Sequence, residues 1–144
     1  MKVRDLVGAR EVVSIHPEAT ALEAARKMAG AGIGALLVRR PDGQVAGIFT
    51  ERDLMVRVVA AGRPPAEVRL SEVATREVFM TDPDADVLGL REELRRRHIR
   101  HVPVVEHERV IAVLSMRDLM RAALEEERAN AHEMRRYIQG GGFP

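Results

Sequence analysis

The chain has 144 residues, of which 46% are hydrophobic and 31% charged, so it is long enough for one folded domain or two very small ones. Its 23 basic and 22 acidic residues leave a net charge of +1, which gives no reason to expect nucleic acid or a membrane surface as a partner. The absence of cysteine excludes disulfides, cysteine-ligated zinc, iron–sulfur clusters and a thiol nucleophile. Aromatic residues make up only 3%, which argues against a stacking platform for single-stranded nucleic acid.

No run approaches the roughly 18 apolar residues that a membrane span requires. The chain starts with the charged stretch Met1-Lys2-Val3-Arg4-Asp5, which lacks the apolar region of a secretory signal. We therefore expect a cytoplasmic protein with no membrane partner.

An internal repeat accounts for most of the chain. Segment 45–55 (VAGIFTERDLM) aligns with segment 110–120 (VIAVLSMRDLM) at an offset of 65, with five of eleven positions identical. Upstream, Pro17 aligns with Pro83 at an offset of 66. The change of one residue falls between two predicted turns, where a difference in length is tolerated. The sequence therefore predicts a duplicated unit of about 65 residues.

The first copy reads as β-α-β-β-α. A β-branched run at 12–15 predicts a strand, and Thr20-Ala21-Leu22-Glu23 is a capping box that predicts the start of a helix. Two more strands are predicted at 35–39 and 45–49, and a second helix after Thr50.

The second copy repeats this order. Its strands are predicted at 78–81, 102–105 and 109–114, with Asp86 as the cap of the first helix and a second helix after Ser115. The fold class is therefore α/β (α+β), with two β-α-β-β-α repeats related by a pseudo-twofold axis. Since one copy has little interior of its own, we expect the two to share one core.

Gly62 and the Pro64-Pro65 pair end the last helix of the first copy and mark a linker. After the second copy, a helix continues from Leu119 toward Ile138 with an imperfect apolar stripe that needs a covering surface. The predicted boundaries are repeat 1 at 1–62, linker at 63–69, repeat 2 at 70–124, and a C-terminal helix with a frayed tail at 125–144.

The most specific motif is the strand end followed by Thr50-Glu51-Arg52-Asp53, with Ser115-Met116-Arg117-Asp118 at the matching place. Each is a capping box, and helix capping alone explains a single occurrence. Two occurrences in register favour a second role. A helix N-terminus suits phosphate, an Asp carboxylate accepts from the vicinal hydroxyls of a ribose, and a Ser or Thr hydroxyl donates to a phosphate oxygen.

These paired motifs, together with the run His98-Ile99-Arg100-His101-Val102-Pro103-Val104-Val105, resemble a tandem CBS-domain pair, also called a Bateman module. The resemblance covers about 3–124 and implies a stand-alone regulatory sensor, with energy sensing among its roles. It implies that AMP, ADP, ATP, NAD(H) or S-adenosylmethionine binds between the repeats, with no other cofactor. It also implies a homodimer and a regulated protein that the sequence does not identify.

The resemblance implies two clefts, each with a ribose-binding Asp and a phosphate-binding hydroxyl. The first would be lined by Asp118, Ser115, Arg117, Arg100, His101, Val12, Val13, Ile33, Gly34 and Ala35. The second would be lined by Asp53, Thr50, Arg52, Val78, Phe79, Ile99 and Arg100.

The two copies differ in ways that bear on the ligand. Arg100-His101 stands where the first copy has Gly34-Ala35, so we expect Arg100, and a charged His101, to contact phosphate in the first cleft. Ala112 replaces the glycine that matches Gly47, which would restrict close backbone approach there.

Two other functions are open. The chain could be a structural dimerisation or scaffold module whose clefts bind nothing, or its basic stripe at 91–100 could bind nucleic acid, although we do not expect the latter. Neither a phosphate-binding glycine loop nor metal-ligand spacing among the five histidines occurs. We therefore expect no metal site and no enzymatic activity.

Overall fold

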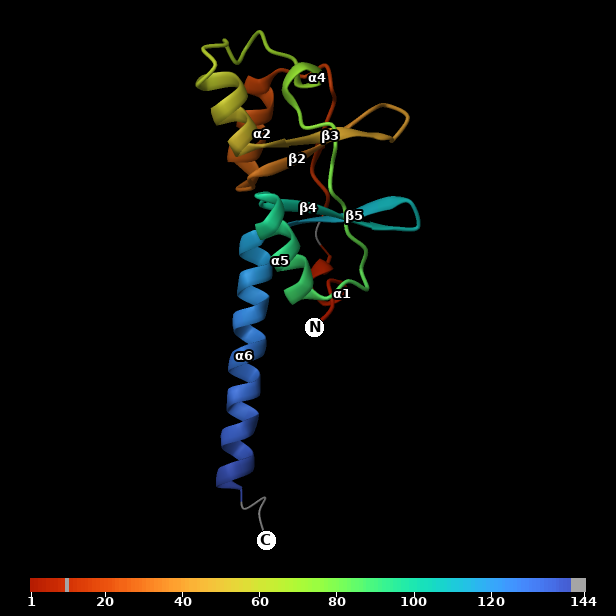
Figure 1. The fold of residues 1–144 in the computed structure, drawn as a ribbon. Coiled ribbons are helices and arrows are strands. Elements are labelled where there is room, and N and C mark those ends of the chain that lie inside the picture. Colours follow the sequence, from red (N-terminus) through yellow and green to blue (C-terminus); the bar gives the residue numbers. More distant parts are fainter. Residues whose placement is uncertain (10, 141–144) are drawn as a thin grey trace.

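The computed structural model describes residues 1–9 and 11–140. The chain forms a mixed α+β structure in which two similar units are stacked (Figure 1). In chain order the elements are α1 (Arg4–Val7), β1 (Ser14–Ile15), α2 (Ala21–Ala31), β2 (Ala35–Arg39), β3 (Val45–Thr50), α3 (Glu51–Asp53), the π-helix η1 (Leu54–Val59), α4 (Leu70–Val73), α5 (Val87–Arg97), β4 (His101–Glu106), β5 (Arg109–Ser115) and α6 (Met116–Gln139).

The first repeat has a three-stranded sheet in the order β1-β2-β3. β1 runs parallel to β2, and β2 pairs antiparallel with β3. Helix α2 begins at the predicted capping box, in which Thr20 Oγ1 accepts from the Glu23 amide (3.1 Å) and Glu23 accepts from the Thr20 amide (3.2 Å). The predicted elements of this repeat are confirmed, except that its last helix starts as α3 and continues as a π-helix.

The second repeat has only two strands, β4 and β5. The strand predicted at 78–81 is wrong: the segment makes a single parallel bridge, between Thr81 and Val104. In the first repeat the Leu37 amide donates to the Val13 carbonyl (3.2 Å). The position equivalent to Leu37 is Pro103, which has no N–H, so the matching hydrogen bond cannot form.

The predicted shared core is also wrong, because each repeat has a separate cluster of buried side chains. Each cluster is completed by a segment from outside its own repeat. Val3, from the N-terminus, is fully buried in the second cluster, and its amide donates to the Ala85 carbonyl (2.9 Å). Val68, in the linker, and Leu70, at the start of repeat 2, are buried in the first cluster. The two repeats are thus held together by exchanged segments.

Helix α6 is continuous, as the sequence predicts, and runs away from both sheets (Figure 1). Its first turns pack on the second core through Leu119 and Ala122. Beyond them the apolar side chains are exposed, Met134 by 65% and Ile138 by 62%. The expected frayed tail lies outside the described residues apart from Gly140, which caps the helix.

Candidate functional site

The first predicted cleft exists as one cavity of about 1400 Å³ between the repeats. All ten side chains assigned to it from the sequence line this cavity. They come from the segment before β1, the α2–β2 junction, the start of β4 and the start of α6. The cavity exceeds the usual range of small-molecule sites because it continues along the exposed side of α6 as far as Glu127.

The second predicted cleft is a separate cavity of about 620 Å³, a volume typical of a small-molecule site. All seven residues assigned to it line its wall. The structure therefore brings together both sets of predicted residues, each around a helix start. Their roles toward a ligand remain predictions.

At the first cleft, Ser115 and Asp118 form the expected capping box at the N-terminus of α6. The Asp118 carboxylate accepts from the Ser115 amide (2.8 Å) and from the Ser115 hydroxyl (3.0 Å), while Ser115 Oγ accepts from the Asp118 amide (3.1 Å). Capping is thus an actual role of this motif. Both side chains also face the cavity, where a polar ligand would meet them.

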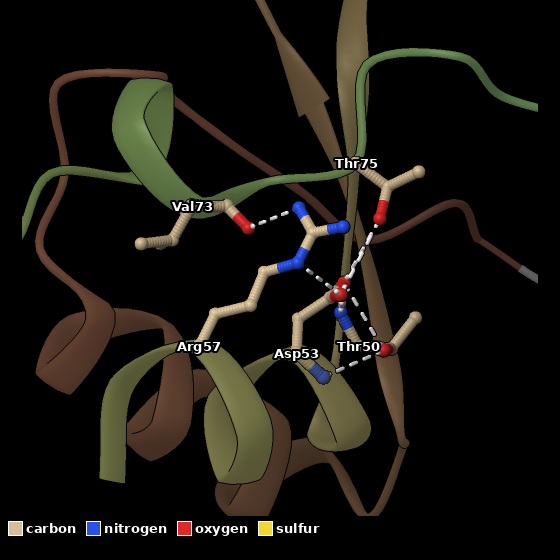
Figure 2. A network of polar contacts seen from close by, with 5 residues as sticks. All are labelled: Thr50, Asp53, Arg57, Val73 and Thr75. Atoms are coloured by element: carbon tan, nitrogen blue, oxygen red, sulfur yellow. Dashed lines mark hydrogen bonds and ion pairs between the residues drawn. The ribbon is translucent and has the colours of Figure 1, made fainter. Parts of the chain in front are cut away.

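At the second cleft, the Asp53 carboxylate lies within a larger polar network (Figure 2). Its Oδ2 accepts from the Thr50 amide (3.0 Å) and hydroxyl (3.1 Å), and its Oδ1 accepts from the Thr75 hydroxyl (3.3 Å). Arg57 Nε lies 3.6 Å from Oδ1, and Arg57 Nη1 donates to the Val73 carbonyl (3.2 Å). The sequence analysis missed Arg57 and Thr75, although the spacing of Asp53 and Arg57 is that of an i,i+4 ion pair on a helix.

His101 lines both cavities, and its contact with a phosphate remains a prediction. Burial lowers the pKa of His101 below its ordinary value, and the positive charge of Arg100 adds to this effect. Glu51 and Asp118 act in the opposite direction and do not outweigh the burial. In the ligand-free protein, burial therefore favours the neutral imidazole, which can both donate and accept a hydrogen bond.

Three residues, Glu51, Arg100 and His101, line both cavities and so form the wall between them. The sequence analysis did not assign Glu51, since its counterpart in the second copy is Met116 and the repeat carries no common signal there. Arg100 is the cation at this wall that the sequence did identify. Its carbonyl also accepts from the Met116 amide (2.7 Å), which fixes the start of α6 against β4.

The basic stripe at 91–100 is partly compensated by two neighbouring carboxylates, Glu92 and Glu93. Glu93 accepts from both Arg96 and Arg97 (2.6 Å each), and these bonds lower the pKa of Glu93. Arg97 also lies over the ring of Phe79, 4.2 Å from its centroid, at the edge of the second cavity. The stripe is therefore a weaker source of positive field than its sequence indicates.

The structure explains why the residue at position 47 is a glycine. The backbone of Thr75 crosses β3 at this point, where the Ile48 and Thr75 amides exchange hydrogen bonds (2.9 Å each). A Cβ on Gly47 would collide with the Thr75 carbonyl oxygen. The glycine at this position thus permits close approach of the chain's own backbone, and Ala112 in the second copy need not mean a restricted cleft.

Within residues 1–9 and 11–140, no group of three or more histidine or carboxylate side chains is arranged to hold a metal ion. In the same part of the chain, no helix is both long and apolar enough to cross a bilayer.

The architecture consists of two repeats with exchanged segments and a cleft at each of the two matching helix starts, and comparison with known proteins identifies its family. The sequence profile of the CBS domain matches residues 3–60 and again 70–125. The chain belongs to the CBS-domain family. A crystal structure of a CBS-domain protein from Agrobacterium tumefaciens has the same fold, with a TM-score of 0.80 and 34% identity over 85% of this chain and 92% of that one.

Other relatives bear on function. A CBS-domain protein of Pyrobaculum aerophilum, solved in complex with AMP, is 29% identical over 88% of this chain and 97% of that one, with a TM-score of 0.76. A mitochondrial CBS domain-containing protein of Arabidopsis thaliana is 32% identical over 126 residues. That match covers 85% of this chain but 61% of the relative, so the chain spans about three fifths of its length.

Proposed function

We propose that this CBS pair is a regulatory module that binds an adenosine-containing ligand in the clefts between its repeats and signals by a change of conformation. The observation that carries the proposal is the first cavity, which is lined by all ten residues chosen from the sequence. The AMP complex of the Pyrobaculum aerophilum relative supports an adenosine ligand. We place the protein in the cytoplasm and assign it no catalytic step.

In this proposal, Asp118 accepts hydrogen bonds from the ribose hydroxyls, and Ser115 and Arg100 contact phosphate oxygens. Apolar side chains from both repeats, such as Val12 and Ile33, would enclose the base. Because one ligand would contact residues of both repeats, its binding energy favours one relative arrangement of the two, which a partner protein can detect.

The experiment is mass spectrometry of small molecules that co-purify with the native protein. It is followed by calorimetric titration with AMP, ADP, ATP, NADH and S-adenosylmethionine. An adenosine compound that binds one or both clefts, and whose binding is weakened by Asp118→Ala or Asp53→Ala, supports the proposal. Failure of all five ligands to bind would favour the alternative, a scaffold whose clefts are not used.

We also propose that the chain forms a homodimer. Support comes from the exposed apolar side chains along α6, which the packing of a single chain leaves in contact with water: Met120, Leu124, Met134, Tyr137 and Ile138.

A further inference from the structure

The second cleft carries polar groups around its aspartate that have no counterpart at the equivalent positions of the first cleft. The network that holds Asp53 contains Arg57 and Thr75. Applying the repeat offsets, 65 for Arg57 and 66 for Thr75, the equivalent positions are Ala122 and Ala9. Neither alanine can form an ion pair or donate a side-chain hydrogen bond, so any effect of this pair on a ligand is confined to the second cleft.

The two partners approach Asp53 differently. Thr75 lines the cavity together with Asp53, whereas Arg57 is not part of the cavity wall. Arg57 contacts the carboxylate at Oδ1 while its guanidinium is anchored on the Val73 carbonyl of α4 (Figure 2). The side chain of Asp53 is only 12% exposed, so a displaced carboxylate would have little water to replace these contacts.

The hydrogen bonds to Asp53 leave one oxygen to be shared with a ligand. Oδ2 accepts from the Thr50 amide and hydroxyl, at 3.0 and 3.1 Å, and these are the capping bonds. The Thr75 hydroxyl contacts are longer, 3.3 Å to Oδ1 and 3.5 Å to Oδ2, and come from a group on the cavity wall. A ligand hydroxyl can take the place of the Thr75 hydroxyl without disturbing Arg57.

We propose that Arg57 is a positioning residue of the second cleft, which holds the Asp53 carboxylate in the orientation that recognises the ribose 2′,3′-diol. This inference rests on the proposed function and adds to it. It makes diol recognition in the second cleft depend on Arg57, while the first cleft works without an equivalent residue.

The test uses a reporter confined to the second cleft. The chain contains no tryptophan, and Phe79 lies in the second cavity, so Phe79→Trp places a single tryptophan there, which is excited selectively over Tyr137. In this background, full-length protein with Arg57, Arg57→Ala or Arg57→Lys is titrated with AMP and with 2′-deoxy-AMP. Arg63→Ala is the matched control, because Arg63 also loses an ion pair near the linker, with Glu72, but does not line either cleft.

For Arg57→Ala we expect AMP affinity at the reporter to fall about fivefold, the size expected for losing a partly exposed ion pair. The affinity for 2′-deoxy-AMP should change little, so the preference for the intact diol shrinks. Arg57→Lys keeps a cation four residues from Asp53 and should restore part of the preference, and Arg63→Ala should leave it unchanged. Circular dichroism and the unfolding midpoint establish that each variant is folded.

Equal loss for AMP and 2′-deoxy-AMP, or no loss for either, would overturn the positioning role. If calorimetry detects AMP but the reporter in the second cleft does not respond in any variant, the positioning role fails while the proposed function stands. If no adenosine ligand binds the wild-type chain in calorimetry, the proposed function fails and this inference fails with it.

Discussion

The imidazole of His101, in the second repeat, lies directly against the α-carbon of Gly34, in the first. A Cβ added to Gly34 would be 3.2 Å from His101 Nε2 and 3.0 Å from both Cδ and Oε1 of Glu51. The point where both clefts share a wall is therefore packed through a residue with no side chain.

Gly34→Ala should destabilise the protein modestly, by up to about 1 kcal/mol, since Glu51 has a flexible side chain that can move. In a Glu51→Ala background, Gly34→Ala should lower the free energy of unfolding by a smaller amount. Urea unfolding of the four proteins in this double-mutant cycle should give a coupling energy of at least about 0.5 kcal/mol. Additive effects would show that the two positions do not touch in solution.

The free energy of unfolding should depend on pH through His101. Its folded pKa is lowered by burial, so the unfolded state, with a pKa near 6.5, binds the proton more readily. As the pH falls below about 6.5, the free energy of unfolding decreases by at most about 1.4 kcal/mol per pH unit. The decrease ends once the pH is below the lower pKa of His101 in the folded state. His101→Gln should lose less stability than wild type between pH 7 and 5.5 in urea titrations. An identical pH dependence of the two proteins would contradict this.

Gly47→Ala should cost about 1–3 kcal/mol, because the new methyl group meets the backbone of Thr75, which cannot move without breaking the bridge to Ile48. Gly30→Ala is the control. A Cβ on Gly30 meets nothing within 4 Å, and Gly30 lies inside α2, so alanine should stabilise by about 0.5–1 kcal/mol. Chemical denaturation measures the free energy of unfolding of both variants. If Gly47→Ala left this free energy unchanged, the crossing backbone of Thr75 would be free to shift.

Asp118→Ala should have two separable effects. Loss of hydrogen bonds to a charged group weakens AMP binding by roughly 1.5–3 kcal/mol, and loss of the cap lowers the unfolding temperature without ligand. Thermal unfolding with and without AMP separates them, since ligand raises stability only while it binds. An AMP-induced shift equal to that of wild type would rule out Asp118 as a ribose contact.

Arg100→Ala should weaken the binding of AMP more than the binding of adenosine, because adenosine has no phosphate for Arg100 to contact.

Shortening α6 should alter the oligomeric state. In a chain that stops after Leu124, the exposed apolar residues Met134, Tyr137 and Ile138 are gone, while Leu119 and Ala122 keep their place in the second core. Light scattering should then give roughly half the mass of the full chain, if the homodimer depends on this segment. A mass that stays dimeric would place the interface on the repeats instead.

Local signals made the secondary structure predictable. The capping boxes at Thr20, Thr50 and Ser115 all form. Matching equivalent positions in the two copies allowed the lining of each cleft to be predicted from the other. The missing strand at 78–81 depends on Pro103, about 25 residues later, whose lack of an N–H matters only once the pairing register is known.

Long-range packing was not predictable in this way. The burial of Val3 in the second core joins residues more than 80 positions apart, and no local pattern indicates it. The lowered pKa of His101 likewise depends on burial, which the sequence around it, with Arg100 at its side, does not reveal. Arg57 was overlooked because the comparison of copies favoured positions that match, and its counterpart is Ala122.

The exchange of segments between the repeats has a consequence for synthesis of the chain. Val3 is synthesised before the rest of the first repeat, whereas the Ala85 carbonyl, which accepts a hydrogen bond from the Val3 amide, is made only after that repeat. The first repeat, in turn, waits for Val68 and Leu70 to complete its own interior. A nascent chain stopped at residue 62 therefore carries one unfinished core and an N-terminal segment whose partners have not yet been made, so neither half is completed before the second repeat emerges.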